Sequence, residues 1–448
     1  MNTFACSLGI DVVGQTINMD IENSQLWCME FDSSTTMAIF LKKIKDFIHP
    51  STTTTGNIHW KSFSQQGSIQ IVPYGITRQE EKIFYYQQRY HATENDEVLR
   101  VKDFIGKDNS VVQQILKQTM LYSRIEEPIT QLSTGEFKIA CLLKAFRPET
   151  KIIFIEELFS GLDEANRSGV IKFLHELKQA LEVCIIVVTT RPYERAYFDQ
   201  YTKIHSQPPQ PQNLNHSESL KFLLRVPHRQ NFQHAFKLSK VVVRYNDRVI
   251  LKDISWAVNK GEKWALHGKN GSGKSTLLSL INADHPQSYA NDILLFDQPR
   301  KYGTSIWEIK DNIGFFSHEF FRFFDKTRSI SDTILSILNS NPYRRSKNQH
   351  EILEKLGLLM QYFEISHDTN RPLYQLTPYQ QRLIVLLGIL LKEAPLLILD
   401  EPYHYFDMTG IAKFNFILDN FLSNTTLIFV SHDEKDFPAC IQHHFYLS

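Results

Sequence analysis

The chain has 448 residues, with 49 basic and 49 acidic side chains and a hydrophobic content of 42%. This length predicts two or three domains with ordinary cores. Because the net charge is zero, no overall positive potential attracts the protein to nucleic acid or to an anionic membrane. A local patch of basic side chains is still compatible with this composition. The five cysteines show no paired spacing, so we expect buried free thiols in a reducing compartment.

The start of the chain lacks the basic and apolar pattern of a signal peptide. We find no stretch that approaches the roughly 20 apolar residues of a membrane span. We therefore expect a cytoplasmic protein, and any membrane component it serves would be a separate chain.

The first half alternates apolar runs with helical patterns. It contains a signature-like segment, Leu132–Glu136, and then an apolar run, Ile152–Ile155, that ends in Glu156 and Glu157. A helical pattern at 166–181 and a second apolar run at 184–188 follow. Short apolar runs that alternate with helices are typical of a parallel sheet covered on both faces.

A segment rich in proline and glutamine, residues 206–215, interrupts the pattern and reads as a linker. The second half then repeats the first: the spacing of 25 positions from Leu132 to Glu157 recurs from Leu376 to Glu401. The repeat indicates a duplicated α/β unit. We predict a first domain at 1–204, a linker at 205–235 and a second domain at 236–448.

A glycine-rich loop follows the strand-like stretch 263–266 and precedes a helical pattern at 275–281. Glycines in this setting let backbone N–H groups surround phosphates, and the following helix adds its positive end. The alternative is a chance glycine-rich turn. The predicted binding residues are Gly268, Asn270, Gly271, Ser272, Gly273, Lys274, Ser275 and Thr276. Lys274 would neutralise the β- and γ-phosphates, and the Ser275 hydroxyl would ligate Mg²⁺.

Asp400 and Glu401 end the apolar run 396–399. We assign Asp400 to the Mg²⁺ shell and Glu401 to orienting or deprotonating an attacking water. The alternative is a structural acid pair.

His432 follows the next apolar run and is placed to reach the γ-phosphate; the alternative is a surface histidine. Tyr245, upstream of the loop, is a candidate to stack on adenine; otherwise it is a tyrosine packed in a strand. The catalytic candidates are therefore Lys274, Glu401 and His432.

Together, the phosphate loop, the LSTGE signature, the Asp-Glu pair and the histidine resemble the ABC ATPase family, in two tandem copies. More narrowly, 277–289, 304–309 and 431–441 resemble the tandem ATP-binding proteins of the ModF-like or photorepair PhrA-like type. The resemblance implies two P-loop (RecA-like) nucleotide-binding domains, each with a helical and an antiparallel β subdomain. It also implies ATP and Mg²⁺ as cofactors.

In this family each ATP lies between the phosphate loop of one unit and the signature of the other. The first half has Met37 at the lysine position, Glu156 at the aspartate position and Thr190 at the histidine position. The second half has the damaged signature, with Pro378 and Tyr379 in Leu376–Gln380. The resemblance thus implies one competent site in a head-to-tail pair within the chain, where the loop around Lys274 faces Ser133, Thr134 and Gly135. The alternative is that the two halves lost these motif residues independently of each other.

His318 stands where the family has a Q-loop glutamine that helps to hold Mg²⁺, so we expect slow turnover. Aromatic runs at 84–86 and 315–324 mark either a protein partner or the core of a helical subdomain. Three functions stay open: a subunit of a transporter with separate permease chains, with molybdate as one cargo; a soluble ATPase acting on a macromolecule in repair, regulation or translation; and an ATP sensor that hardly hydrolyses. Nucleic acid is not indicated as a partner.

Overall fold

The computed structural model describes most of the chain. It covers residues 5–12, 15–48, 58–61, 68–72, 99–106, 110–117, 119–129, 132, 134–160, 162, 164–205, 232–245, 248–269, 271–300, 305–317, 321, 324–338, 348–422 and 424–447. The chain divides into two compact units: Met1–Gln210 with Tyr405–Met408, and Pro211–His404 with Thr409–Ser448.

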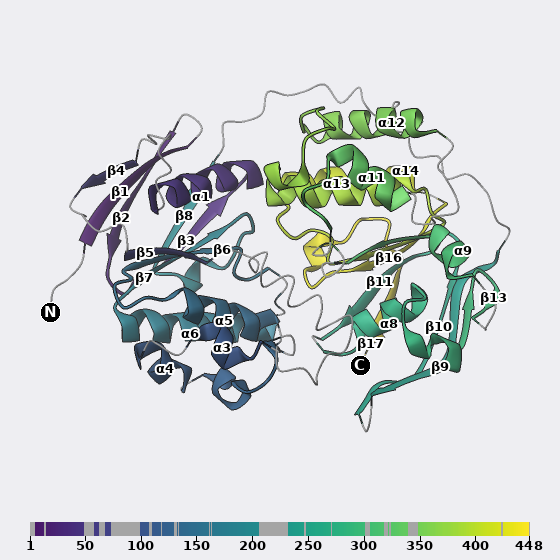
Figure 1. Ribbon diagram of the computed structural model, residues 1–448, viewed down its shortest axis with the longest axis horizontal. Coiled ribbons are helices and arrows are strands. Elements are labelled where there is room, and N and C mark those ends of the chain that lie inside the picture. Colours follow the sequence, from purple (N-terminus) through teal and green to yellow (C-terminus); the bar gives the residue numbers. More distant parts are fainter. Residues whose placement is uncertain are drawn as a thin grey trace. The chain divides into compact units, whose positions relative to one another are not determined.

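The first unit is built on a five-stranded parallel sheet in the order β5-β6-β7-β3-β8 (Figure 1). Its strands are β3 (Leu26–Phe31), β5 (Ile69–Val72), β6 (Ile152–Glu156), β7 (Cys184–Thr189) and β8 (Gln200–Ile204). A separate antiparallel sheet, in the order β2-β1-β4, contains β1 (Ala5–Val12), β2 (Gln15–Glu22) and β4 (Ile58–Lys61). The helices are α1 (Ser34–Ile48), α3 (Val101–Ile105), α4 (Ser110–Leu116), α5 (Thr134–Ala145) and α6 (Glu164–Leu181).

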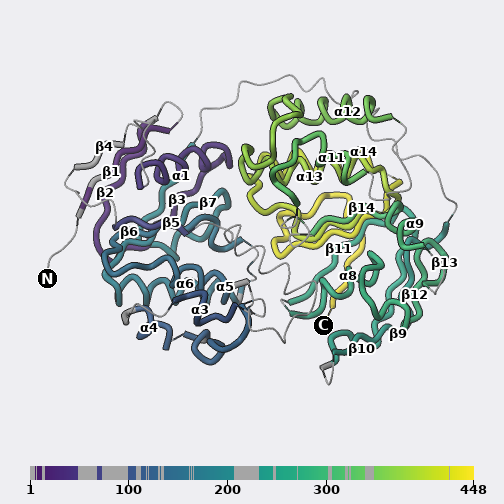
Figure 2. Tube along the Cα trace, viewed as in Figure 1, coloured from purple at the N-terminus to yellow at the C-terminus, as the bar shows by residue number. Residues whose placement is uncertain are grey.

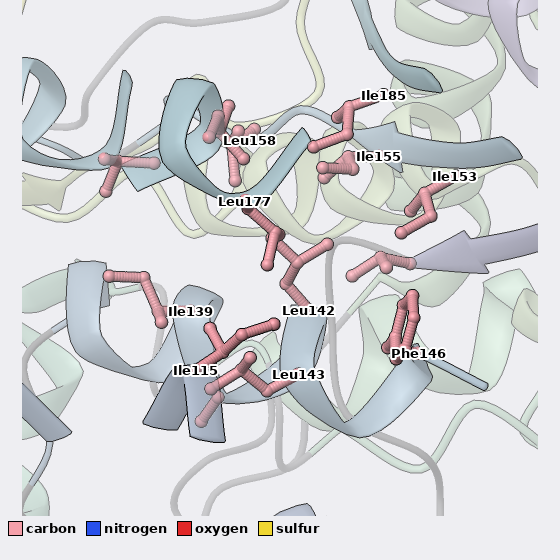
Figure 3. Close-up of a cluster of buried hydrophobic side chains, with 14 of the residues drawn as sticks. Ile115, Ile139, Leu142, Leu143, Phe146, Ile153, Ile155, Leu158, Leu177 and Ile185 are labelled. Atoms are coloured by element: carbon pink, nitrogen blue, oxygen red, sulfur yellow. The ribbon is translucent and has the colours of Figure 1, made fainter. Parts of the chain in front are cut away.

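Both faces of this parallel sheet are buried, which explains the continuous apolar runs in the sequence. Successive side chains of a strand point to opposite faces. Ile153 and Ile155 of β6 therefore join the core with α5 and α6, whereas Ile152 and Phe154 join the core with α1. Figure 3 shows the first of these cores, where Leu142 and other side chains of α5 lie against the β6 side chains.

The second unit has a parallel sheet of the same design, in the order β14-β15-β16-β11-β17 (Figures 1 and 2). Its strands are β11 (Lys263–Gly268), β14 (Ile313–Phe316), β15 (Leu396–Asp400), β16 (Thr426–Val430) and β17 (His443–Leu447). An antiparallel sheet, in the order β10-β9-β12-β13, contains β9 (His234–Tyr245), β10 (Arg248–Asn259), β12 (Asp292–Leu295) and β13 (Gln298–Pro299). The helices are α8 (Lys274–Ile281), α9 (Ile306–Asp311), α11 (Ile330–Leu338), α12 (Gln349–Tyr362), α13 (Pro378–Leu391) and α14 (Met408–Phe421).

The two strand orders match element by element, with β3 and β11 as the fourth strand in each. The predicted fold class, two tandem α/β units that each combine a parallel sheet, helices and an antiparallel sheet, is therefore confirmed. All five cysteines are free; Cys6, Cys28 and Cys184 are buried as predicted, whereas Cys141 and Cys440 are partly exposed. Among the described helices, none has the length and apolarity needed to cross a membrane.

Candidate functional site

Three chemically distinct segments meet at one edge of the second unit's parallel sheet. The strands β15, β16 and β11 are neighbours and run parallel, so their carboxyl ends lie together. The glycine-rich loop follows β11, the carboxylate pair ends β15, and His432 follows β16. Ligands of open α/β sheets bind at this edge.

The glycine-rich loop has a backbone that only glycine adopts easily. Gly271 and Gly273 have φ angles of +81° and +95°, in the left-handed region. A Cβ on Gly268 would lie 2.5 Å from Ser272 Oγ and 2.9 Å from the carbonyl oxygen of Leu447. The loop therefore tolerates no side chain at its first position, and it can turn its N–H groups inward. Asn270 lies outside the described residues.

Helix α8 starts directly from this loop at Lys274, with Gly273 as its N-cap. The Lys274 Nζ atom donates to the carbonyl oxygens of Gly268, at 2.5 Å, and Lys269, at 3.1 Å. Its ammonium thus folds back over the loop. Ser275 and Thr276 follow in the first helical turn, and the Ser275 side chain is exposed. The positive end of α8 and the ammonium both favour an anion here.

The two carboxylates differ in backbone conformation. Asp400 closes β15 and pairs with Val430, whereas Glu401 adopts a left-handed φ of +49° and its N–H donates to the Val430 carbonyl at 3.0 Å. Arg382 of α13, which is fully buried, donates to the carbonyls of Glu401 at 2.7 Å and Pro402 at 2.8 Å. This turn and its arginine brace hold the Glu401 side chain at the strand edge.

Two histidines approach the Glu401 carboxylate. The Nε2 atom of His432 lies 3.5 Å from one carboxylate oxygen, and the Nε2 atom of His404 lies 4.0 Å from the other. Ser431, which precedes His432, donates to the Asp436 carboxylate at 2.9 Å and fixes the turn. The structure brings Glu401 and His432 together as the sequence suggested. His404 and Arg382 were not predicted, because only the folded chain brings them to Glu401.

Tyr245 ends β9 with its side chain 45% exposed, so it is not packed inside the sheet. Its hydroxyl lies 2.8 Å from His285 Nε2. The hairpin of β9 and β10 pairs Tyr245 with Arg248, and Ile250 and Leu251 of β10 lie against Gly273. The tyrosine ring is thereby tied through β10 to the phosphate loop.

The comparisons with known proteins agree with this geometry. Residues 251–404, which include the loop and the carboxylate pair, match the family described as ABC transporter. Over 368 residues the chain is 33% identical to "ABC transporter ATP-binding protein ModF" of Escherichia coli (strain K12), covering 75% of this chain and 74% of that relative. This chain belongs to the ABC transporter ATP-binding family. An uncharacterized ABC transporter ATP-binding protein of Schizosaccharomyces pombe is 26% identical over 460 residues, 95% of this chain and 93% of the relative.

As a member of this family, the chain is an ATP-binding ATPase with a P-loop fold. Its two units nonetheless differ at equivalent positions. Cys28 pairs with Val187 in the first sheet as Ala265 pairs with Phe429 in the second, and the following strands are in the same register. By this register Phe31 takes the place of Gly268. Phe31 is fully buried and its ring lies 5.3 Å from that of Phe40.

Counted along the chain from this register, Met37 corresponds to Lys274. Met37 belongs to α1 and is 2% exposed in the core that this helix covers. Where the second unit has a cation over its loop, the first unit has an apolar side chain in its interior. Phe31 and Met37 carry no charge, unlike Lys274 in the second unit.

In the first unit, the glutamate that corresponds to Glu401 is Glu157, and its side chain has a structural role. Glu157 has a φ of +46°, like Glu401, but its side chain is 1% exposed. Its carboxylate accepts hydrogen bonds from Thr190 N at 2.7 Å, Thr190 Oγ1 at 2.8 Å and Thr189 Oγ1 at 3.0 Å. Thr190 occupies the position of His432. Glu157 is thus a buried acceptor held by threonines.

The helices that carry the two signatures also begin differently. Helix α13 starts at Pro378, and its N-cap Thr377 forms a capping box with Gln380. That box uses the Gln380 N–H internally. Helix α5 starts at Thr134, within the intact-like signature, with Gly135 as its second residue. Ser133 and His318 lie outside the described residues, and so do the surroundings of the Thr134 side chain and of Gly135.

Part of the aromatic run at 315–324 lies in the hydrophobic core. Phe316 is fully buried and Phe321 is 7% exposed, and the Arg382 guanidinium lies 4.8 Å and 5.3 Å from their ring centroids. These two rings therefore fill the interior beside α13, which favours the core alternative for them. The first-half run at 84–86 lies outside the described residues.

Proposed function

We propose that this ATPase hydrolyses one ATP per cycle, at the phosphate loop of the second unit, and that the first unit supplies only its signature helix. The observation that carries the proposal is the contrast between the two glutamates. Glu401 lies 3.5 Å from His432 and its side chain stays 19% exposed, whereas Glu157 is 1% exposed and accepts three hydrogen bonds from threonines.

The proposed roles of the site residues follow from the charge of each side chain and from its position at the sheet edge. The loop N–H groups and Lys274 bind the β- and γ-phosphates, and Tyr245 stacks on adenine. Glu401 orients the attacking water and accepts its proton. His432, beside Glu401, donates to the γ-phosphate and so stabilises the charge that develops there. Holding these groups on adjacent strand ends fixes their geometry before ATP arrives.

The oxygen donors at this edge fit Mg²⁺, which prefers hydroxyl, carboxylate and phosphate oxygens. Ser275 and Asp400 are the residues that would hold the ion, with a contribution from His318. When bound, the ion would neutralise charge on the β- and γ-phosphates. Among the described residues no group of three or more His, Cys, Asp or Glu side chains forms a separate metal site.

The composite nature of the site is supported by the start of α13, whose N–H groups are satisfied within the helix itself. An uncapped helix start presents N–H groups to an anion, whereas a capping box satisfies them from its own side chains. Helix α13 has such a box at Thr377, and its first turn contains a proline without an N–H. We therefore assign the γ-phosphate contact to Ser133, Thr134 and Gly135.

The test is the Gly135→Asp variant. A carboxylate at this position would repel the γ-phosphate, so we expect ATP hydrolysis to fall at least about 100-fold, in line with loss of a contact to the reacting group. ATP binding by the second unit should persist. The matched control is Tyr379→Ala in α13, which should hydrolyse ATP within about 2-fold of the parent. Normal hydrolysis by Gly135→Asp would overturn the composite site.

We further propose that hydrolysis is coupled to transport through separate membrane subunits at the cytoplasmic face of a membrane. In support, a cavity of about 440 Å³ lies beside β14 and α9 in the second unit. Half-exposed Trp307 lines it together with Phe315, Phe324, Lys310 and Arg328. Lys310 and Arg328 form ion pairs with Asp284 and Asp325, which line the same cavity. The aromatic wall therefore suits a protein segment that carries apolar side chains.

The Glu401→Gln variant loaded with ATP should retain a membrane-spanning partner during purification. Adding Trp307→Ala should release the partner, whereas adding Tyr446→Ala, another exposed aromatic of this unit, should not. Molybdate is the cargo to test first, because it is the one that the sequence resemblance implies. Capture of nucleic acid or of soluble complexes alone would contradict the transport assignment and favour action on a macromolecule.

A further inference from the structure

The segment after the phosphate-loop helix has a conformation that the roles above leave unexplained. Residues His285, Pro286 and Gln287 enter the short helix η5 (Pro286–Ala290), which lies next to β12 in the second unit. Both His285 and Gln287 reach back to the end of β9, some 40 residues earlier. A short segment therefore makes two separate attachments to the strand that carries Tyr245.

The tautomer of His285 can be assigned from its partners. Its Nδ1 atom accepts a hydrogen bond from the Gln287 backbone N–H at 3.2 Å, so Nδ1 carries no proton. In the neutral ring the proton is then on Nε2, which donates to the Tyr245 hydroxyl at 2.8 Å. Burial, which leaves His285 only 6% exposed, lowers the pKa of the imidazole and keeps it neutral.

The strand backbone beside Tyr245 is held by Gln287. Its side-chain oxygen accepts from the Arg244 N–H at 3.2 Å, and its side-chain nitrogen donates to the Arg244 carbonyl at 2.8 Å. Both groups of one amide thus mimic a strand neighbour. The ring and the backbone of the Arg244-Tyr245 pair are consequently fixed by the same segment.

The same segment is anchored to the phosphate loop. The backbone N–H groups of Asp284 and His285 donate to the Ser279 carbonyl of α8, at 2.9 Å and 3.2 Å. Helix α8 begins at Lys274, inside the loop. A continuous path of hydrogen bonds therefore runs from the phosphate-binding helix through His285 to the tyrosine ring.

We propose that His285 is a positioning residue, which holds the Tyr245 ring as a ready-made adenine platform at a set distance from the phosphate loop. This inference rests on the proposed stacking of adenine on Tyr245. The imidazole meets the ring edge-on, with centroids 5.9 Å apart and planes at 69°. An exposed tyrosine without this contact would be ordered only on binding, which would weaken the affinity for ATP.

The test compares substitutions that keep or lose the donor at the Nε2 position. His285→Gln places an amide N–H about where Nε2 lies and should leave the KM for ATP within about 2-fold. His285→Asn and His285→Ala cannot reach the hydroxyl, and Tyr245→Phe removes the hydroxyl while keeping the exposed ring. These three should raise the KM for ATP about 3- to 10-fold, the range expected for one neutral hydrogen bond, with kcat unchanged.

Inorganic tripolyphosphate separates base recognition from phosphate binding. It carries the three phosphates without a nucleoside, so its inhibition constant against ATP hydrolysis should be the same in the parent and in all four variants. A weaker inhibition in His285→Ala would mean that the substitution damages the phosphate loop, and it would overturn the positioning role.

Tyr245→Ala distinguishes failure of this inference from failure of the proposed stacking. If Tyr245→Ala leaves the KM for ATP unchanged, the adenine platform itself is wrong. If it raises the KM while His285→Ala and Tyr245→Phe do not, only the positioning role fails. In the Tyr245→Ala background His285→Ala should add nothing further, and an equal loss in both backgrounds would contradict an action through the ring.

Discussion

Glu157 and Glu401 occupy the same place in two copies of one fold, yet their surroundings give them different chemistry. Each follows a parallel strand, each has a left-handed φ, and each backbone N–H donates to the neighbouring strand. In the second unit the carboxylate meets two histidines, whereas in the first it is enclosed by Thr189 and Thr190. Backbone geometry was retained in both units, and the side chains from the adjacent strand decide the role.

The difference teaches that one backbone conformation can hold a glutamate in two quite different surroundings. A buried carboxylate is costly unless hydrogen bonds satisfy it. The threonine hydroxyls and the Thr190 N–H do so in the first unit. Phe31 and Met37 are also buried in the first unit. The comparison therefore predicts that equivalent substitutions will affect activity in one unit and stability in the other.

The largest expected effect comes from removing the acid in each unit. Glu401→Gln should lower ATP hydrolysis about 100- to 10,000-fold, because a positioned base contributes this much, and should leave ATP binding intact. Glu157→Gln should hydrolyse ATP within about 2-fold of the parent. It should instead lower the free energy of unfolding by about 1–3 kcal/mol, because donors are left without a charged acceptor.

Steady-state phosphate release and denaturant unfolding of both variants provide the measurements. A loss of hydrolysis in Glu157→Gln of the size expected for Glu401→Gln would show that both edges are catalytic, and the distinction between the units would be wrong.

A smaller difference between the two units is expected at His432 and Thr190, which follow the strands next to those that carry the glutamates. His432→Ala should slow hydrolysis about 10- to 100-fold, since it removes one hydrogen bond to a charged group. Thr190→Ala should leave hydrolysis unchanged and cost about 1–2 kcal/mol of stability, because the hydrogen bond from Thr190 Oγ1 to Glu157 is lost. The kcat values and unfolding midpoints of the two variants decide this. Equal effects on kcat would argue against different roles for these positions.

The sequence was sufficient where the information is local. Apolar runs such as Ile152–Ile155 predicted buried parallel strands, and the spacing of glycines before Lys274 predicted the loop and helix that the structure contains. The 25-residue spacing predicted the duplication. Each of these features depends on neighbouring residues or on periodicity, so it can be predicted without knowledge of the tertiary contacts.

The sequence was insufficient where remote residues meet. Arg382 contacts the Glu401 turn 19 residues away, and His285 reaches Tyr245 across 40 residues. Neither pairing follows any periodic pattern. The state of Glu157 depends on Thr189 and Thr190, more than 30 residues downstream. The sequence indicated only that Thr190 replaces a histidine. The aromatic run at 315–324 shows the same difficulty. The sequence does not reveal whether these rings lie on the surface or in the core, and in the structure Phe316 is fully buried.

The central claim, one working nucleotide site per chain at the second unit's loop, is tested most directly by counting bound ATP. Equilibrium binding to the Glu401→Gln protein, in which bound ATP should survive, should give one ATP per chain. The count should fall to zero when Lys274→Ala is added and stay at one with Met37→Leu, which conserves core volume. Two ATP per chain, or binding that survives Lys274→Ala, would contradict the account.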